Sequence, residues 1–494
     1  MSGREDVRAV PVLVVGAGPA GLVTAATLAR YGVGSLLVER HRGLSPLPRA
    51  TGVSTRTMEL LRSWGLEDQV RAGELDIVDA GGWATETLAA PQGVMLPSGF
   101  PSRRQVAAVS PTTLAAVPQD HLEPVLLGRL RTCPTARVRF GTELVAFDHD
   151  EAGVTAELRD GPAGGSTVVR ARFLVGTDGA HSGVRAALGV GMDGPDHLGE
   201  HLTVLFRAPL GEVVGDRRYG IYFIQHPEAA GVLVPSGADD RWLYGRNWRP
   251  DRERLEDYTE ARLARLIRTA AGVPGLRPRI LAMGNFSSAA QVAERYRDGG
   301  AFLVGDAAHR MTPRGAMGMN TAIGDAHDLG WKLAWVLRGW AGPELLDTYG
   351  AERRPVGLRR TAQSAADGPE PDGAAALAED LGGRVAHAWL RRDGGRVSTL
   401  DLLGPGLTLF TGPHAAAWRH AAATVDAPVP LAVQPLDRVA ADAIGIGGRG
   451  AALVRPDGQV AARWPAAAPD AQAALRQAVR RLVAPVPAGV DGRR

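Results

Sequence analysis

The feature that most constrains the fold is a glycine-rich stretch near the start of the chain, Gly16-Ala17-Gly18-Pro19-Ala20-Gly21. The apolar run 10–15 before it predicts a buried β-strand, and the residues after it predict a helix to about 31. Glycines at such a junction permit a tight turn and let backbone N–H groups approach a pyrophosphate at the helix N-terminus. Glu39 ends a second predicted strand, 36–39, where its carboxylate can accept ribose hydroxyls. These residues predict a dinucleotide site without separating FAD from NAD.

The composition narrows the class of protein. The 494 residues suit two or three domains, and the formal net charge is only +3. Basic and acidic residues are interleaved, so we expect neither a nucleic acid nor a membrane as partner. The uncharged stretch 9–29 resembles a membrane span or signal, but its glycines and Pro19 interrupt the continuity that a spanning helix needs. The single cysteine, Cys133, excludes an internal disulfide and fits a cytoplasmic location.

Two later predicted strands each deliver an aspartate to the sheet edge where ligands bind in α/β folds. In 173–185 (FLVGTDGAHSGVR) the strand ends in Asp178-Gly179, which is also a common strand-end turn. In 301–309 (AFLVGDAAH) it ends in Asp306, which can bind polyol hydroxyls such as those of a ribityl chain. The stretch 313–320 (PRGAMGMN) then opens a long predicted helix, 319–337, whose N-terminus can hold negative charge at the edge of a reduced flavin.

The rest of the chain indicates two further regions. Between about 190 and 285, short alternating runs predict an antiparallel sheet with one covered face. The segment 363–373 (QSAADGPEPDG) is typical of a linker. After it, the pattern indicates a small separate α/β domain, with strands at 399–403, 407–409 and 430–433, a helix at 414–422, a hairpin over 452–464 and a closing helix at 470–482.

In this order and spacing, the three motifs resemble those of the class A flavoprotein monooxygenases, the para-hydroxybenzoate hydroxylase group, over residues 10–362. Segments 45–62 (SPLPRATGVSTRTMELLR) and 117–126 (VPQDHLEPVL) are similar to actinobacterial polyketide aromatic hydroxylases of the aklavinone and angucycline type. The region after 376 resembles their thioredoxin-like third domain. The resemblance implies an α/β fold with a GR2-type, Rossmann-like FAD-binding domain (1–80, 111–189 and 286–362), an inserted antiparallel-sheet substrate domain (81–110 and 190–285), a linker (363–375) and a thioredoxin-like domain (376–494).

The resemblance also implies which residues bind FAD without a covalent bond: Gly16, Gly18, Ala20, Gly21, Glu39, Arg40, Arg49, Gln119, Asp178, Gly179, Asp306, Gly318, Met319 and Asn320. The glycine loop would hold the pyrophosphate, Glu39 the adenosine ribose and Asp306 the ribityl chain. Asp178 would serve both FAD and visiting NADPH, and the residues 318–320 would contact the isoalloxazine edge. Two assignments have plain alternatives, since Arg49 also fits a surface ion pair and Gln119 a helix cap.

The implied reaction belongs to the cofactor rather than to a protein nucleophile or a metal, and no metal site is expected. NADPH, a transient co-substrate, reduces FAD; O2 then forms a C4a-hydroperoxide beside Pro313; and an aromatic polyketide-like or other phenolic small molecule takes one oxygen atom. Such a hydroxylase would serve secondary-metabolite biosynthesis as a monomer or homodimer. The candidate substrate contacts, each of which also fits a core or surface position, are Trp83, Tyr222, Gln225, His226 and Trp248.

The residues leave one other function open and exclude or disfavour three more. A flavin-dependent oxidase or reductase that inserts no oxygen stays open. A pyridine-nucleotide disulfide reductase is excluded by the single cysteine, and a flavin halogenase is disfavoured because the only lysine, Lys332, lies inside the helix 319–337. A nucleotide-binding protein without turnover is disfavoured by the intact Asp178 and Asp306 motifs. The C-terminal region has no Cys-X-X-Cys, so we expect it to be structural.

Overall fold

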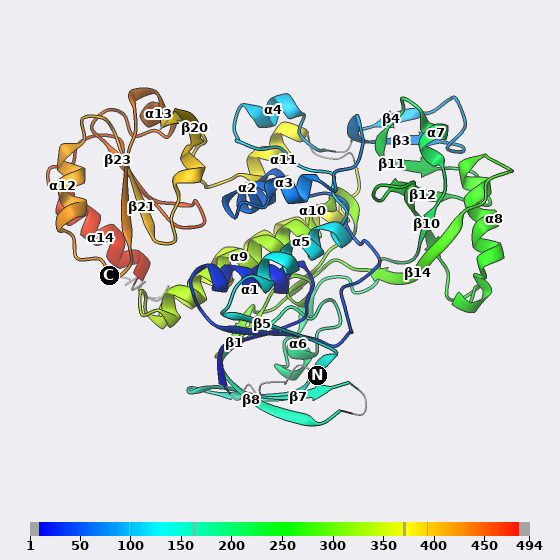
Figure 1. Cartoon of the computed structure of the whole chain (residues 1–494), viewed down its shortest axis with the longest axis horizontal. Coiled ribbons are helices and arrows are strands. Elements are labelled where there is room, and N and C mark those ends of the chain that lie inside the picture. Colours follow the sequence, from blue (N-terminus) through cyan, green and yellow to red (C-terminus); the bar gives the residue numbers. More distant parts are fainter. Residues whose placement is uncertain (1–8, 98, 162–163, 369–371, 393, 484–494) are drawn as a thin grey trace, which may run out of the picture.

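A computed structural model describes residues 9–483 except 98, 162–163, 369–371 and 393. Figure 1 shows three parts side by side: a central α/β part, a sheet-rich part on the right and a small α/β part on the left. The predicted linker 363–375 starts in the last turn of α10 (Asp347–Ala365) and ends in α11 (Gly373–Asp380), and its residues 369–371 lie outside the described residues.

The central part is built on an eight-stranded sheet. Its main order is β16 (Arg297–Asp298), β17 (Ala301–Leu303), β8 (Ser166–Gly176), β1 (Ala9–Val15), β2 (Ser35–Glu39) and β5 (Ala136–Phe140). β1 is parallel to β2 and β8, and β17 is parallel to β8, so their carboxyl ends meet at one edge. β6 (Thr142–Asp150) and β7 (Gly153–Asp160) extend β8 as antiparallel strands. The predicted aspartates and Glu39 therefore share an edge.

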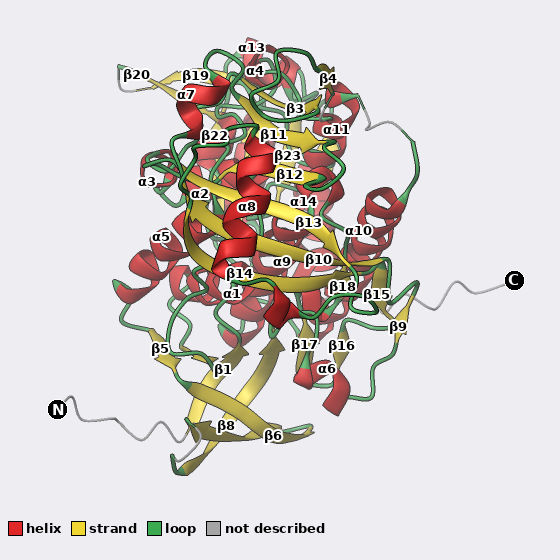
Figure 2. Cartoon of the chain, turned by 90° about the vertical axis from the view of Figure 1, so that its right-hand side faces the viewer, coloured by secondary structure: helices red, strands yellow, loops and turns green. Residues whose placement is uncertain are grey.

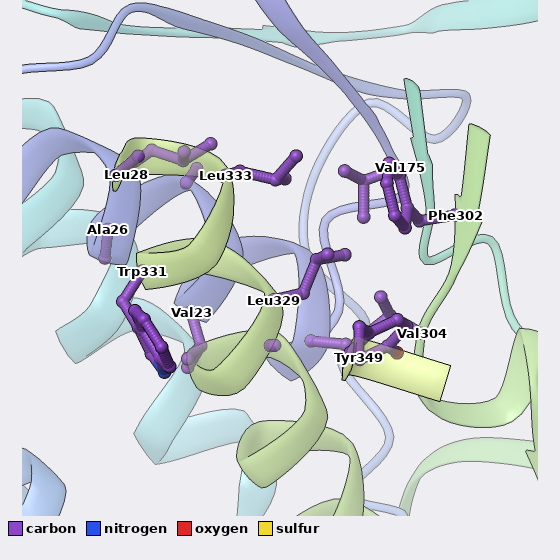
Figure 3. Packing of buried hydrophobic residues seen from close by; sticks show 14 of the residues in the cluster. Val23, Ala26, Leu28, Val175, Phe302, Val304, Leu329, Trp331, Leu333 and Tyr349 are labelled. Carbon is purple, nitrogen blue, oxygen red and sulfur yellow. The ribbon is translucent and has the colours of Figure 1, made fainter. Parts of the chain in front are cut away.

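Two helices, α1 (Pro19–Arg30) and α9 (Gly318–Leu337), pack together on this sheet. Figure 3 shows Val23 and Ala26 of α1 beside α9, and Leu329 of α9 on the side that faces the strand residues Val175 and Phe302. The helices approach closely because Gly330 has no side chain, and a Cβ there would lie 2.7 Å from Thr27 Cβ. This packing fixes the N-termini of both helices relative to the carboxyl edge of the sheet.

Further helices and a small sheet complete the central part. Its helices are α2 (Thr55–Ser63), α3 (Glu67–Arg71), α4 (Arg103–Ala107), α5 (Gln119–Arg131) and α6 (Gly183–Ala187). A small sheet joins β18 (His309–Arg310), β15 (Gln291–Ala293) and β9 (Met192–Asp193). Among the described residues, no helix combines the length and the apolar character needed to cross a bilayer.

The part on the right of Figure 1 is a seven-stranded sheet. Its order is β14 (Arg279–Ser288), β10 (Gly199–Arg207), β13 (Arg241–Trp248), β12 (Gly231–Pro235), β11 (Tyr219–Ile224), β3 (Asp79–Thr85) and β4 (Val94–Leu96). Figure 2 shows α8 (Glu260–Ala271) lying across one face, and α7 (Leu210–Val214) adds to the same core. Alternate residues such as Leu202 and Val204 are buried in that core, so the other face is left for a ligand.

The C-terminal part has a four-stranded sheet in the order β22 (Leu431–Pro435), β21 (Leu407–Thr411), β23 (Ala451–Val454) and β24 (Val460–Trp464). Its helices are α12 (Ala416–Thr424), α13 (Arg438–Ala443) and α14 (Ala471–Val483), and β19 (Trp389–Arg392) and β20 (Gly395–Ser398) form a separate ribbon. The predicted strand at 399–403 is wrong, because Thr399–Leu402 is a 3-10 turn. Ser398 caps it by accepting from Leu400 N, and Asp401 accepts from Ser398 N.

Buried ion pairs anchor the C-terminal part to the central part. Arg384 donates to both carboxylate oxygens of Glu59 on α2, at 2.8 and 2.9 Å. Lys332 is fully buried on α9, and its Nζ lies 2.8 Å from Asp328 and 3.1 Å from Glu352. Arg455 reaches the same Glu352 at 2.8 Å. The only lysine of the chain is thus a structural group rather than a reactive one.

Candidate active site

One cavity of about 2480 Å³ runs from the carboxyl edge of the central sheet to the open face of the inserted sheet. Gly16, Gly18 and Glu39 line one end, and Val232 and Phe286 line the other. A pocket for one drug-sized ligand measures roughly 300–1,000 Å³. The cavity is therefore large enough for a dinucleotide and a second ligand together.

The glycine loop has the shape that a pyrophosphate requires. Gly16 has a φ of +106°, and a Cβ there would lie 2.4 Å from the carbonyl oxygen of Thr177. A Cβ at Gly21 would lie 1.9 Å from the carbonyl oxygen of Gly16. At Gly18, by contrast, a Cβ would meet nothing within 4 Å, and no side chain caps the helix α1 that begins after it. The two packed glycines hold the turn, and the open one leaves space for a phosphate beside the N–H groups of Ala20 and Gly21.

Glu39 lies at the end of β2 against this loop. Its Oε2 accepts from the backbone N–H of Ala17 at 3.0 Å, and its Oε1 accepts from the N–H of His41 at 2.8 Å. Arg40 and Arg49 are exposed and line the cavity, and the described residues supply no hydrogen bond or ion pair to Arg49. An unpaired guanidinium beside a helix N-terminus suits a diphosphate and argues against the alternative of a surface ion pair.

A buried pair on α5 adds a carboxyl that the sequence interpretation did not single out. Gln119 lines the cavity and its Nε2 donates to Oε1 of Glu123 at 2.7 Å. Glu123 is 2% exposed, and burial raises the pKa of its carboxyl to about 7, against the lowering effect of Gln119 and Arg49. The sequence signal that could have identified Glu123 is its i, i+4 spacing from Gln119, which places both residues on one face of the helix.

Asp178 bonds to the start of helix α6, whose N-cap residue is Ser182. Its Oδ1 accepts from Ser182 Oγ at 2.5 Å and its Oδ2 accepts from the N–H of Val184 at 3.0 Å. Asp178 and Gly179 still line the cavity. Any bond from Asp178 to a nucleotide would use the remaining lone pairs, so its expected role with FAD and NADPH stays a prediction.

Asp306, Pro313, Gly318 and Met319 all line the cavity near the start of α9. The carboxylate of Asp306 is exposed to the cavity just after β17, and a Cβ at Gly318 would meet nothing within 4 Å. No side chain caps α9. Its N-terminus therefore presents a positive dipole end to the cavity, as a flavin edge that becomes negative requires.

Asn320 has a different role from the expected one. It is 8% exposed and does not line the cavity. Its Oδ1 accepts from the N–H of Ser54 at 2.8 Å, and its Nδ2 donates to the carbonyl oxygen of Gly52 at 3.0 Å. The side chain thus fixes the segment 52–54, of which Gly52 and Val53 line the cavity.

The segment predicted as a linker contributes to the cavity wall. Thr312 N donates to Ser364 Oγ at 3.2 Å, and Arg314 donates to the carbonyl oxygens of Ala366 and Gly368. Gly368 itself lines the cavity. These bonds tie the loop that carries Pro313 to the connection between the central and C-terminal parts.

The structure does not bring the five predicted substrate residues to the cavity. Tyr222 is 1% exposed, and its hydroxyl donates to the carbonyl oxygen of Arg217 at 2.6 Å. Trp83 and Trp248 pack against the core under α8, whereas Gln225 and His226 lie in the loop after β11. The error has a simple physical reason, because a shift of one residue along a strand exchanges the covered face for the open one.

The open face of the inserted sheet is mostly apolar. The strand residues that line the cavity include Leu96, Thr203, Ile221, Phe223, Val232, Val234, Leu243, Asn247 and Phe286. His201 also lines the cavity on this face, and an imidazole can change its charge near neutral pH. In the described part of the chain, no group of three or more His, Cys, Asp or Glu side chains could hold a metal ion.

Comparisons with known proteins agree with this geometry. Residues 9–364 match a family model described as an FAD binding domain, and residues 378–485 match one described as aromatic-ring hydroxylase, C-terminal. Tetracenomycin A2 monooxygenase-dioxygenase of Streptomyces glaucescens is 38% identical over 96% of this chain and 97% of its own length. An aklavinone 12-hydroxylase of Streptomyces peucetius is 39% identical over 83% of this chain and 92% of its own.

Solved structures give the same result. A ternary complex of aklavinone-11 hydroxylase with FAD and aklavinone matches with a TM-score of 0.85 at 37% identity, covering 98% of this chain and 100% of that one. The fold and cavity thus define a flavin-dependent monooxygenase. The chain belongs to the FAD-binding aromatic-ring hydroxylases, the class A flavoprotein monooxygenases that the sequence resembles. The fold class expected from the sequence is confirmed.

Proposed function

We propose that this enzyme hydroxylates a polycyclic, phenolic small molecule of polyketide type, with FAD bound non-covalently and NADPH as the electron donor. The observation that carries the proposal is the single cavity that joins the phosphate-binding loop to an apolar sheet face. Relatives named as polyketide and aklavinone hydroxylases support the substrate class. A planar fused-ring substrate suits this face because its flat apolar surface can be buried against Ile221, Val232 and Phe286.

The residues of the central part would hold the cofactor. Gly18 and the N-terminus of α1 would receive the pyrophosphate with Arg49 as counter-charge, Glu39 would accept the ribose hydroxyls, and Asp306 would accept those of the ribityl chain. Gly318 and Met319 would contact the flavin edge. When bound, FAD would supply the redox chemistry, that is, hydride acceptance from NADPH and the transfer of one atom of O2 to the substrate.

The protein's own contribution is positioning and the exclusion of water. The apolar sheet face would orient the ring, and the bonded loop 312–316 would hold Pro313 over the reaction site. Arg40, Arg49 and the loop 178–181 stand at the nucleotide end, where a visiting NADPH could approach. The cationic side chains there suit the extra phosphate that distinguishes NADPH from NADH.

The test is the origin of the oxygen. Purified FAD-loaded enzyme is incubated with NADPH, isotopically labelled O2 and a panel of polycyclic phenols, and product masses are measured. We expect one labelled oxygen per product, and NADPH oxidation that is slow alone and faster with substrate. NADH serves as the matched control for donor choice.

Two results would overturn the proposal. Product that forms equally well without oxygen would support a flavin-dependent reductase or oxidase instead. Product whose new oxygen comes from labelled water would exclude a monooxygenase reaction with this substrate.

A further inference from the structure

The segment 52–54, called here the wall segment, belongs to the cavity wall, and hydrogen bonds fix its backbone. The N–H and C=O of Val53 pair with those of Ala115, at 2.8 and 3.0 Å. Asn320 donates to the carbonyl oxygen of Gly52 and accepts from the N–H of Ser54. Because every one of these bonds leads to another part of the chain, the wall segment stands where its partners hold it.

Asp380, the last residue of α11, holds the wall segment from a distant part of the chain. Its Oδ1 accepts from Ser54 Oγ at 3.1 Å, and its Oδ2 accepts from the N–H of Arg56 at 2.9 Å. Ser54 is the N-cap of α2, and Arg56 lies in the first turn, where backbone N–H groups have no partner within the helix. The carboxylate thus completes the cap that Ser54 begins, and fixes the end of the wall segment.

The other end of α11 lies against the loop that follows β4. A Cβ on Gly373, the first residue of α11, would lie 2.6 Å from the carbonyl oxygen of Phe100. Leu377 and Leu381 pack with Val106 of α4 in a small buried cluster. Figure 1 shows α11, in yellow, beside α4. This short helix therefore contacts both the Phe100 loop and the start of α2.

The Phe100 loop and the wall segment meet at Gly52. Phe100, Gly52 and Ala316 all line the cavity. A Cβ on Gly52 would lie 3.9 Å from Phe100 Cζ and 3.9 Å from Ala316 Cβ. Ala316 belongs to the loop that carries Pro313 and leads into α9. The wall segment thus separates the inserted part from the expected flavin edge by about the width of one methyl group.

Ion pairs hold α11 against the central part. Glu379 accepts from Arg360 Nη1 and from Gln363 Nε2 of α10, each at 3.0 Å. Shortly after α11, Arg384 pairs with Glu59 of α2, and these two side chains are 4% and 2% exposed. A helix held on two sides can transmit its position to the groups that it contacts.

Resting on the proposed function, we infer that α11 is a positioning helix, which sets the separation between the wall segment and Phe100 through Asp380 and Gly373. A closed wall keeps water and small solutes away from the reaction. Coupled turnover converts NADPH, H+, O2 and an aromatic C–H into NADP+, water and a phenolic C–OH. Uncoupled turnover converts NADPH, H+ and O2 into NADP+ and hydrogen peroxide, and the substrate is unchanged. Displacement of the wall segment favours the uncoupled reaction.

The experiment compares the two ends of α11 in the full-length, FAD-loaded enzyme. Asp380→Ala removes both bonds to the start of α2. Asp372→Ala, the matched control, removes the N-cap bond from Ala374 N–H, 3.0 Å long, and leaves the bonds to Ser54 and Arg56 in place. Two milder variants accompany them: Asp380→Asn keeps one acceptor oxygen, and Ser54→Ala removes the hydroxyl that donates to Asp380.

Three quantities are measured for each protein. Product and hydrogen peroxide per NADPH are determined with a phenol that wild type converts. Acrylamide quenching of flavin fluorescence reports, without any substrate, how freely a small neutral solute enters the cavity. Thermal unfolding reports the stability of the fold.

We expect Asp380→Ala to give several-fold less product per NADPH, a matching rise in hydrogen peroxide and a several-fold larger quenching constant. Asp380→Asn and Ser54→Ala should lie between Asp380→Ala and wild type, since each keeps part of the bonding. Asp372→Ala should unfold at a lower temperature because a helix cap is lost, with product per NADPH and quenching as in wild type.

The results that would overturn the inference differ from those that would overturn the proposed function. Wild-type quenching and coupling in Asp380→Ala, or the same losses in Asp372→Ala, would make α11 a helix that only stabilises the fold. If Asp380→Ala did not fold, Asp380→Asn and Ser54→Ala decide by the same measurements. Wild type that inserts no labelled oxygen into any phenol would remove the hydroxylase assignment, and the quenching comparison would still decide the inference.

Discussion

The two ends of the cavity are built in different ways. At the glycine-loop end, the groups that would meet the cofactor are backbone N–H groups and helix termini, placed by residues that must be glycine. At the sheet end, side chains such as Ile221, Phe223 and Phe286 form the wall, and many apolar residues could replace them. The first kind of site fixes residue identity and leaves a motif in the sequence. The second kind of site constrains only shape and polarity, so its residues can differ between enzymes with different substrates while the cofactor end stays the same.

The largest expected effect on stability distinguishes the roles of two glycines in the same loop, Gly16 and Gly18. Gly16→Ala would force a side chain into a positive φ and to 2.4 Å from Thr177 O, so we expect a loss of about 4 kcal/mol or more in unfolding free energy. Gly18→Ala meets no atom within 4 Å and should fold normally. Its Cβ would instead enter the phosphate space, so FAD content should fall.

Thermal unfolding and flavin absorbance of the two purified variants check this. If Gly18→Ala retained full FAD while Gly16→Ala folded normally, the distinction between a turn glycine and a contact glycine would be lost.

The second effect is a pH dependence at the cofactor end. Burial raises the pKa of Glu123 from 4.5 to about 7, so the folded protein binds this proton more tightly than the unfolded chain. The resulting stability is complete below pH 4.5 and is lost as the pH rises through 7. The loss amounts to about 3 kcal/mol.

Glu123→Gln should remove this pH dependence, so that the FAD-free variant exceeds wild type in stability at pH values above 7 and not below 4.5. Denaturant unfolding of both proteins across this range is the measurement. Parallel curves would show that Glu123 is not the group responsible.

The difference between the two ends also explains what the sequence could predict. Gly16 and Glu39 were found because strand, turn and acid occur at fixed points of one βαβ pattern, and Asp306 because a later buried strand leads into it. All three residues line the cavity. Tyr222 and Trp248 were misplaced because alternation identifies two faces without saying which one a helix covers. Asn320 lies in the expected helix turn, but its bonds to Gly52 and Ser54 depend on a segment far away in the chain. His201 had no local motif, since its neighbours in the sheet come from two other strands, β13 and β14.

A third effect should separate cofactor affinity from folding. Asp306→Ala removes a carboxylate that is exposed to the cavity, and a hydrogen bond to a charged group contributes about 1.5–3 kcal/mol. FAD should therefore bind about 10- to 100-fold more weakly, with little change in the unfolding of FAD-free protein. Asp426→Ala, an exposed aspartate of the C-terminal part, is the matched control. Fluorescence titration of apoprotein with FAD measures the affinity, and equal dissociation constants for both variants would contradict the assignment.

The smallest and most local effect tests the two faces of one strand. Tyr222 and Phe223 are neighbours on β11, yet the structure buries the first under the sheet and places the second in the cavity wall. Tyr222→Phe removes the hydroxyl that donates to Arg217 O and accepts from Tyr219 N at 3.0 Å, so these two backbone groups keep only their 3.1 Å bond to each other. We expect it to cost about 0.5–1.5 kcal/mol of stability with KM for the aromatic substrate unchanged. Phe223→Leu should do the reverse, since it alters the wall while leaving the core under α8 intact, so KM should rise several-fold with little change in unfolding.

Denaturant unfolding and steady-state kinetics on the same preparations decide the matter. If Tyr222→Phe changed KM while Phe223→Leu changed only stability, the sheet would present the opposite face to the substrate.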